Sequence, residues 1–556
     1  MKITTKISMN RDTLIKIGAV VVIIIFAVVG IKGCNDDKQV ENAISNVTIE
    51  KNQVNEVVLS MVPVKTLNPL VSTDEDVFYI NKLIYSSLFT FDSNMKPVGD
   101  LAKEYTFKGD TLTVKLASAK WHDGKTVDAE DVAFTVDAIK AIGDKGEYFE
   151  KADKIDSVSG SGSNLKITFK DSDDKSLSYL SFPILPEHKF DSAYSVKTET
   201  EDFKPIGSGM FKYVSYDATK EMKLKKNDTY YGKKANSDLR IRVVKANSNR
   251  TKMAETSNIT AFLDERANRV TKITKKNIKI KNFISNQVEF IGFNFNNELL
   301  TNKNLRKAIA YGLDVDKVIE ENYYNSLKQS DSLYYPNYLG SEKLDKPYGY
   351  SVDDASKLLK DEKFVDENDD KILDSKDGKP LKFKLIVDKN NKNRIGVAQE
   401  LQGSMDRLGI DIEIAELETK VYKDALKKGN FDLYIGGMVL DESIDMRNLL
   451  KTEGEFNFTK YSDEKVDGLL DDLFSGKTEE ENLQAVNELK KYLNEELPYY
   501  CIGYKTYGIV KSPVLNGDLT PNFINPYGGI ETWYCEYEKR VEDKTEVETP
   551  EKDKTK

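Results

Sequence analysis

Residues 118–132, Ser-Ala-Lys-Trp-His-Asp-Gly-Lys-Thr-Val-Asp-Ala-Glu-Asp-Val, join a tight turn to the start of a helix. Asp123-Gly124 indicates the turn, because glycine readily adopts the positive φ that a sharp reversal needs. An alternating, strand-like pattern at 112–116 precedes it. Asp128 has the position of a helix N-cap, whose carboxylate accepts from free backbone N–H groups, and Val132 begins the apolar face. The local prediction is strand, turn and capped helix.

Other short segments accompany this one along most of the chain. They are Leu67-Asn68-Pro69-Leu70, Tyr85-Ser86-Ser87-Leu88, Pro97–Ala102, Pro205–Gly209 with Phe211 and Tyr213, Asn294–Ala308, Leu408-Gly409-Ile410 and Phe431-Asp432. In kind and order they resemble the family 5 extracellular solute-binding proteins, the peptide- and nickel-binding receptors of ABC importers. The resemblance runs from about residue 55 to 537. Tyr105 departs from the pattern, since the family usually has tryptophan there.

The resemblance implies an α/β fold: a two-lobed periplasmic-binding-protein-like fold of the large, three-subdomain type, with mixed sheets and a hinge. The chain would cross the hinge twice, so each lobe is discontinuous in sequence. The expected parts are lobe I at 54–74, 200–290 and 500–538, an inserted subdomain at 75–199, and lobe II at 291–499.

Periodicity supports a mixed sheet in the second half of the chain. Apolar residues recur at helical spacing in 350–360 and 396–408. Strand-like alternation occupies 381–387, 410–414 and 431–435. The resulting β-α-β-α-β order favours helices that cover a sheet.

Composition and charge exclude several classes of protein. The chain is 39% hydrophobic and 31% charged, which is ordinary for a folded soluble protein rather than a disordered one. A formal net charge of −10, with acids and bases interspersed, argues against nucleic acid as a partner, because phosphate binding needs a basic surface. We expect a monomer.

The N-terminus carries an export signal. Residues 17–31 are uninterruptedly apolar and follow several basic residues, so segment 1–33 is expected to hold the rest of the chain on the extracellular face. Gly33-Cys34 resembles a lipoprotein cleavage site, with Cys34 as the lipidated residue. Lys32 does not fit that pattern, which leaves an uncleaved signal anchor as the alternative. Either reading attaches the protein to the cell membrane.

Polar composition predicts no fold for the two ends of the remaining chain. Residues 34–53 are interpreted as a tether and 539–556 as a disordered tail. Three cysteines are too few for a disulfide framework. Cys501 and Cys535 either form one bridge or stay as two buried thiols.

Catalytic motifs are missing from the sequence. The two histidines, His122 and His188, are far apart, and no serine, cysteine or lysine stands in a nucleophile motif, so both are assigned structural roles. Gly207-Ser208-Gly209 precedes a strand-like run rather than a helix, which favours a turn over a phosphate loop. We expect no enzyme activity and no cofactor.

One loop has calcium-like spacing. Oxygen-bearing side chains occupy positions 1, 3, 5, 9 and 12, namely Asp366, Asn368, Asp370, Asp374 and Asp377. Lys371 replaces the glycine that such a loop needs for its sharp turn. A solvated acidic hairpin is therefore favoured over a calcium site, and no metal is expected.

The resemblance also names candidate ligand residues. Asp441 matches the carboxylate that holds the α-ammonium of a peptide, and Asp445 is its alternative, because Glu442 and Met446 replace the family's Tyr and Pro. Met438 stands where a Gly-Trp pair is common near the ligand.

These features imply a receptor that captures an oligopeptide outside the cell and delivers it to the permease subunits of an ABC importer. Two alternatives stay open. One is a nickel-chelate or other small-solute receptor on the same fold, and the other is a peptide-sensing surface protein without a transport role.

Overall fold

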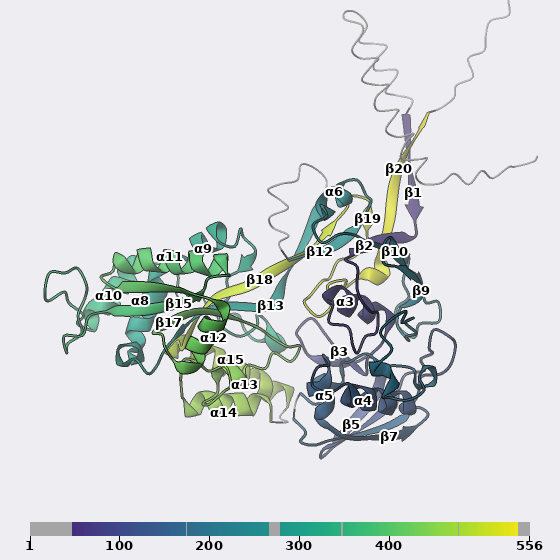
Figure 1. Ribbon diagram of the computed structural model, residues 1–556, viewed down its shortest axis with the longest axis horizontal. Helices are drawn as coiled ribbons and strands as arrows, with labels where there is room; N and C mark the ends of the chain where they lie inside the picture. The colour runs from purple at the N-terminus through teal and green to yellow at the C-terminus, as the bar shows by residue number, and fades with distance from the viewer. Residues whose placement is uncertain (1–46, 174, 266–277, 346–347, 476–477, 543–556) are drawn as a thin grey trace, which may run out of the picture. The chain divides into compact units, whose positions relative to one another are not determined.

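The computed structural model describes residues 47–173, 175–265, 278–345, 348–475 and 478–542 (Figure 1). The predicted export segment and Cys34 lie outside these residues. No helix within them is both long and apolar enough to cross a membrane. The described residues divide into two compact units, one formed by 54–535 and one by the segments next to the two termini.

In the terminal unit, two strands correct the prediction of unstructured ends. β1 (Val47–Val54) neighbours β20 (Tyr534–Glu542) in a sheet, so the last part of the expected tether and the first part of the expected tail are strands. Composition missed them because both segments are polar. A strand satisfies its backbone N–H and C=O groups through its partner, whatever its side chains are.

A four-stranded sheet combines the start of the main unit with residues far along the chain. β2 (Glu56–Met61) pairs in parallel with β11 (Asp238–Val243), and β10 (Glu221–Lys226) and β9 (Phe211–Asp217) continue the sheet. Val57, Leu59 and Ile241 are completely buried. Burial of this apolar face holds together segments about 180 residues apart.

The turn-helix segment at 118–132 follows a strand of a second sheet. Its strand order is β5 (Ala102–Lys108), β6 (Thr111–Leu116), β8 (Asn164–Phe169) and β7 (Ile155–Ser161). Gly124 has φ of 95°, and Asp128 caps α4 (Ala129–Ile142) in a reciprocal capping box with Asp131. The prediction of strand, turn and capped helix is confirmed. Trp121 is buried and donates from Nε1 to Asp131 at 2.9 Å.

The predicted β-α-β-α-β order is also confirmed. β15 (Lys382–Asp388), α11 (Lys392–Asp406), β16 (Asp411–Leu417), α12 (Thr419–Lys428) and β17 (Leu433–Val439) follow one another. The strands occur in a seven-stranded sheet in the spatial order β17-β15-β16, with parallel pairing. The helix expected at 350–360 is α10 (Val352–Asp361).

Two long strands, β13 (Lys279–Phe293) and β18 (Tyr499–Lys511), lie side by side and connect two cores (Figure 1). At one end they reach a small core with Val58, where Ile280 and Val510 pack beside β12 (Ala261–Asp264). At the other end Ile291 and Ile502 belong to the large core of the seven-stranded sheet. The ladder shifts register twice between Ile284 and Phe290.

Further elements surround these sheets. The helices are α3 (Glu75–Ile84), α5 (Phe149–Asp153), α6 (Arg250–Glu255), α8 (Lys303–Gly312), α9 (Val315–Glu321), α13 (Arg447–Leu450), α14 (Glu464–Leu473) and α15 (Glu479–Glu496), and the short strands are β3 (Phe89–Phe91), β4 (Pro97–Gly99), β14 (Leu327–Lys328) and β19 (Leu515–Asn516). Cys501 and Cys535 are two buried thiols rather than one bridge, which settles the alternative left open above.

Candidate ligand-binding cleft

The main unit contains a cavity of about 810 Å³, which we call the cleft. Its wall comes from the start of α3, from residues 147–154 and 175–179, from the segment 439–448 at the end of β17, and from Phe523 and Ile524. The volume lies in the usual range for ligand sites, ~300–1,000 Å³. A void beside Gln329 and Cys501 holds only about 20 Å³, which is the room of one water molecule.

Helix α3 is fixed by close backbone packing. Val77, Ile80 and Leu83 form its buried face, which leaves Phe78 and Tyr79 beside the cleft. At its end the Gly209 N–H donates to the Ile84 carbonyl at 2.8 Å. Added Cβ atoms at Gly207 or Gly209 would collide with Ile84. The segment that resembled a phosphate loop is thus a bend, as predicted, and it packs against the end of α3.

His122 connects this bend to the turn-helix segment. Its Nδ1 accepts from the Gly207 N–H at 3.2 Å, and its Nε2 lies 3.1 Å from the Gly209 carbonyl. Burial lowers the pKa of His122 to about 4. His188 instead contacts Asp123 at 2.8 Å. Neither histidine lines the cleft, and these contacts agree with the structural roles predicted for both.

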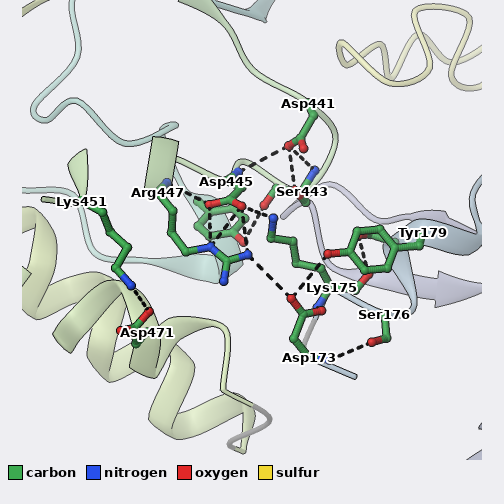
Figure 2. Close-up of polar contacts among 12 residues, drawn as sticks. Asp173, Lys175, Ser176, Tyr179, Asp441, Ser443, Asp445, Arg447, Lys451 and Asp471 are labelled. Atoms are coloured by element: carbon green, nitrogen blue, oxygen red, sulfur yellow. Dashed lines mark hydrogen bonds and ion pairs between the residues drawn. The ribbon is translucent and has the colours of Figure 1, made fainter. Parts of the chain in front are cut away.

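Asp441, the first candidate for the ligand, lies on the cleft wall and is exposed. Its Oδ1 accepts from the Ser443 N–H at 3.0 Å, the Ser443 hydroxyl at 2.7 Å and the Asp445 N–H at 3.4 Å (Figure 2). These bonds fix the loop through one carboxylate oxygen. Within the described residues, Asp441 has no cationic partner.

Asp445 also lines the cleft, but it has partners already. It lies between Lys175 and Arg447, with Arg447 Nη2 at 3.1 Å from Oδ2 (Figure 2). Burial by itself would raise the pKa of Asp445, yet Lys175 and Arg447 outweigh burial and lower it. Both cations contact the ring of Phe474. Asp445 is therefore less available to a ligand than Asp441.

Glu442 is the cleft residue whose role the sequence did not reveal. Its carboxylate accepts from Lys82 of α3 at 3.1 Å, from Lys151 of α5, and from the Ser181 hydroxyl at 3.0 Å. Its side chain is 16% exposed. Burial would raise the pKa of Glu442, but Lys151 and Lys82 reverse this and lower it, so the group is ionised. The one sequence signal was a glutamate where the family has tyrosine.

Met438 belongs to β17, where it pairs with Val288 of β13. It is not among the residues that line the cleft. In the loop of the calcium alternative, candidate side chains bind backbone groups of the loop itself. Asp366 and Asp370 accept backbone N–H groups of their own loop, from Lys371 and Ile372 at 2.9 Å each. Across the described ranges, including this loop, no three His, Cys, Asp or Glu side chains are grouped as a metal site requires.

A second cavity of about 490 Å³ adjoins the cleft at the start of α3. Asp74, Glu75 and Tyr79 line both cavities. Asp76, Asp264, Glu265 and Arg250 also line the second one. The two cavities therefore share one acidic wall.

Comparisons with known proteins agree with this architecture. Residues 96–455 match the family model described as bacterial extracellular solute-binding proteins, family 5 Middle. The chain is 25% identical over 518 residues to the oligopeptide-binding protein AppA of Bacillus subtilis (strain 168), covering 89% of this chain and 94% of that protein. It is 22% identical over 448 residues to the nickel-binding protein NikA of Staphylococcus aureus (strain NCTC 8325 / PS 47), covering 79% and 87%.

A solved structure shows the same fold at low identity. The nickel ABC transporter structure from Bacillus halodurans matches with a TM-score of 0.75 and 19% identity, over 87% of this chain and 100% of that one. The predicted α/β, two-lobed periplasmic-binding-protein-like fold is confirmed.

Proposed function

Because the chain belongs to the bacterial extracellular solute-binding proteins of family 5, we propose that it captures oligopeptides outside the cell and delivers them to the permease of an ABC importer. The observation that carries the proposal is the exposed carboxylate of Asp441 on the wall of an 810 Å³ cleft. A peptide brings an α-ammonium to this carboxylate. In a closed cleft the two form a strong, charge-assisted hydrogen bond.

The resemblance to AppA, named an oligopeptide-binding protein, covers 89% of this chain and supports this ligand class. A nickel-chelate or other small-solute receptor is the second candidate, and the resemblance to NikA favours it. In the described residues the cleft offers no histidine and no metal-binding cluster, so a metal would have to arrive within its own chelate. A peptide-sensing surface protein without transport would use the same cleft.

Titration calorimetry with the full-length protein in detergent micelles tests the proposal. We expect peptides with a free N-terminus to bind more tightly than their N-acetylated forms. Asp441→Asn should weaken the free forms roughly tenfold or more and leave the acetylated forms nearly unchanged, because only the free forms bring a cation. Glu413→Gln, an exposed change on β16, is the matched control. Binding of nickel chelates but of no peptide would favour the second candidate.

We further propose a hinged closure with the lobe boundaries expected from the family. Lobe I would take 54–74, 200–290 and 500–538, and lobe II 291–499, with 75–199 inserted. The two cores joined by β13 and β18 support this division. Binding between lobes buries the ligand and stabilises the folded state by RT ln(1 + [L]/Kd), about 2.7 kcal/mol at a hundredfold excess over Kd.

For its place in the cell, we propose a monomer attached to the outer face of the membrane through lipid on Cys34, with an uncleaved signal anchor as the alternative. Family membership supports an extracellular location. Cys34→Ala should leave a heavier, unprocessed chain if Cys34 carries lipid. Intact-mass measurement on membrane fractions distinguishes the two, since equal masses for both proteins would favour the anchor.

A further inference from the structure

We propose that the cleft selects peptides that carry lysine or arginine side chains in addition to the α-ammonium. This inference rests on the proposed function and specifies its ligand. It follows from the charge balance of the wall, because the basic residues of the cleft are mostly neutralised by the protein's own carboxylates while most of its acids are not.

The bases are engaged internally. Lys151 pairs with Glu442, which also pairs with Lys82 of α3. Lys175 and Arg447 both pair with Asp445. Lys154 is the one lining base with no carboxylate partner among the described residues. A ligand carboxylate therefore meets few free cations in this cleft.

The acids are in excess. Seven carboxylates line the cleft against four cationic side chains. Five of the carboxylates form no ion pair with any described residue, namely those of Asp74, Glu75, Glu147, Glu150 and Asp441. Asp74 and Glu75 also line the adjoining cavity, together with Asp76, Glu265 and the single base Arg250. Burial and then the charge of Glu265 raise the pKa of Glu75, as expected where carboxylates lie close together.

Aromatic rings give the same preference. Phe78, Tyr79, Tyr148, Tyr179 and Phe523 line the cleft. Two of these rings already contact lysine ammonium groups of the protein. Lys82 Nζ lies 4.4 Å from the centroid of Phe78, and Lys151 Nζ lies 5.9 Å from the centroid of Tyr148. A ring face attracts ammonium and guanidinium groups, so a basic ligand side chain finds both acids and ring faces here.

Three pentapeptides with identical, free ends and a central lysine, norleucine or glutamate test the inference by calorimetry on the full-length protein in micelles. We expect the lysine peptide to bind roughly tenfold more tightly than the norleucine peptide, and the glutamate peptide most weakly. The ratio of the affinity for the lysine peptide to that for the norleucine peptide should fall as the salt concentration rises from about 20 mM to about 500 mM, because salt screens exposed charges.

The double variant Glu147→Gln/Glu150→Gln should reduce this ratio roughly threefold, whereas Glu413→Gln should keep it. Equal affinities for the three peptides, or tightest binding of the glutamate peptide, would overturn the inference and leave peptide capture standing. A ratio that the double variant does not change would overturn the assignment to this wall. Absence of binding by all three would count against the proposed function itself.

Discussion

Lys82 of helix α3 donates to the carboxylate of Glu442 at 3.1 Å, and the two residues lie 360 positions apart in the chain. The same ammonium donates to the Ile524 carbonyl at 3.0 Å. Lys151 of α5 completes the arrangement from a third segment. One carboxylate thus holds three parts of the cleft wall together.

Replacement of this carboxylate should loosen the wall. Glu442→Gln leaves Lys82 and Lys151 close together without a counter-charge, and both are about a quarter exposed at most. We expect a loss of about 1–3 kcal/mol in the free energy of unfolding, below the 3–5 typical of a fully buried pair. Thermal denaturation with Glu413→Gln as the control measures it.

Hydrogen exchange of the same variant reports where the loss occurs. Amides of the loop 439–448 and of α5 should exchange faster in Glu442→Gln, while those of β15 and β16 should not. Unchanged exchange in the loop, with a stability equal to that of the unmodified protein, would show that the ion pairs do not hold the wall.

A methyl group at Gly207 should destabilise the protein, although φ there is outside the positive range that favours glycine. The added Cβ would meet the backbone of Ile84, which has no rotamer to change, so we expect Gly207→Ala to destabilise the protein by roughly 2 kcal/mol or more. Gly468 of α14 has no atom within 4 Å of such a Cβ, and Gly468→Ala should be neutral or slightly stabilising. Equal melting temperatures for the two variants would contradict this reading of the packing.

His122 should make stability fall as the pH drops. Burial lowers its pKa to about 4 from 6.5, so below about pH 6.5 the unfolded chain gains a proton that the folded chain refuses until about pH 4. This proton uptake by the unfolded chain should lower the free energy of unfolding by about 1–3 kcal/mol between those two pH values. Asp100 and Asp131, whose pKa values burial raises to about 6, act in the opposite direction in the same window.

A comparison of His122→Gln with the unmodified protein isolates the histidine, because the two aspartates are common to both. The unfolding free energy at about pH 4.5, relative to that at about pH 7.5, should be higher in the variant than in the unmodified protein, as measured by urea denaturation. Parallel pH profiles would mean that His122 titrates equally in the folded and unfolded chains.

Trp121→Phe tests the decisive segment directly. The change keeps most of the apolar volume but removes the Nε1–H that donates to Asp131. We expect a loss of about 1–3 kcal/mol, since a buried acceptor loses a partner. Chemical denaturation measures it, and a loss below about 0.5 kcal/mol would assign the role of Trp121 to packing alone.

What could be predicted from the sequence was local or repeated. The cap at Asp128 and the alternation in 381–387 act within a few residues, so they are visible without a partner. The pairing of β1 with β20 was not visible, because two polar segments gain their strand character only from each other. Glu442 was visible only as a departure, since nothing near it in the chain names Lys82 or Lys151 as its partners.

The register shifts between Ile284 and Phe290 have a mechanical consequence. Regular strand pairing resists twisting, because each ladder hydrogen bond must bend with its neighbours. The β13–β18 ladder is interrupted at this level, so we expect the regular stretches on either side to rotate about it more easily than an unbroken ladder would allow. We therefore expect the backbone to oppose separation of the proposed lobes only weakly. Side-chain ion pairs such as those of Glu442 would then set the separation of the lobes when no ligand is present.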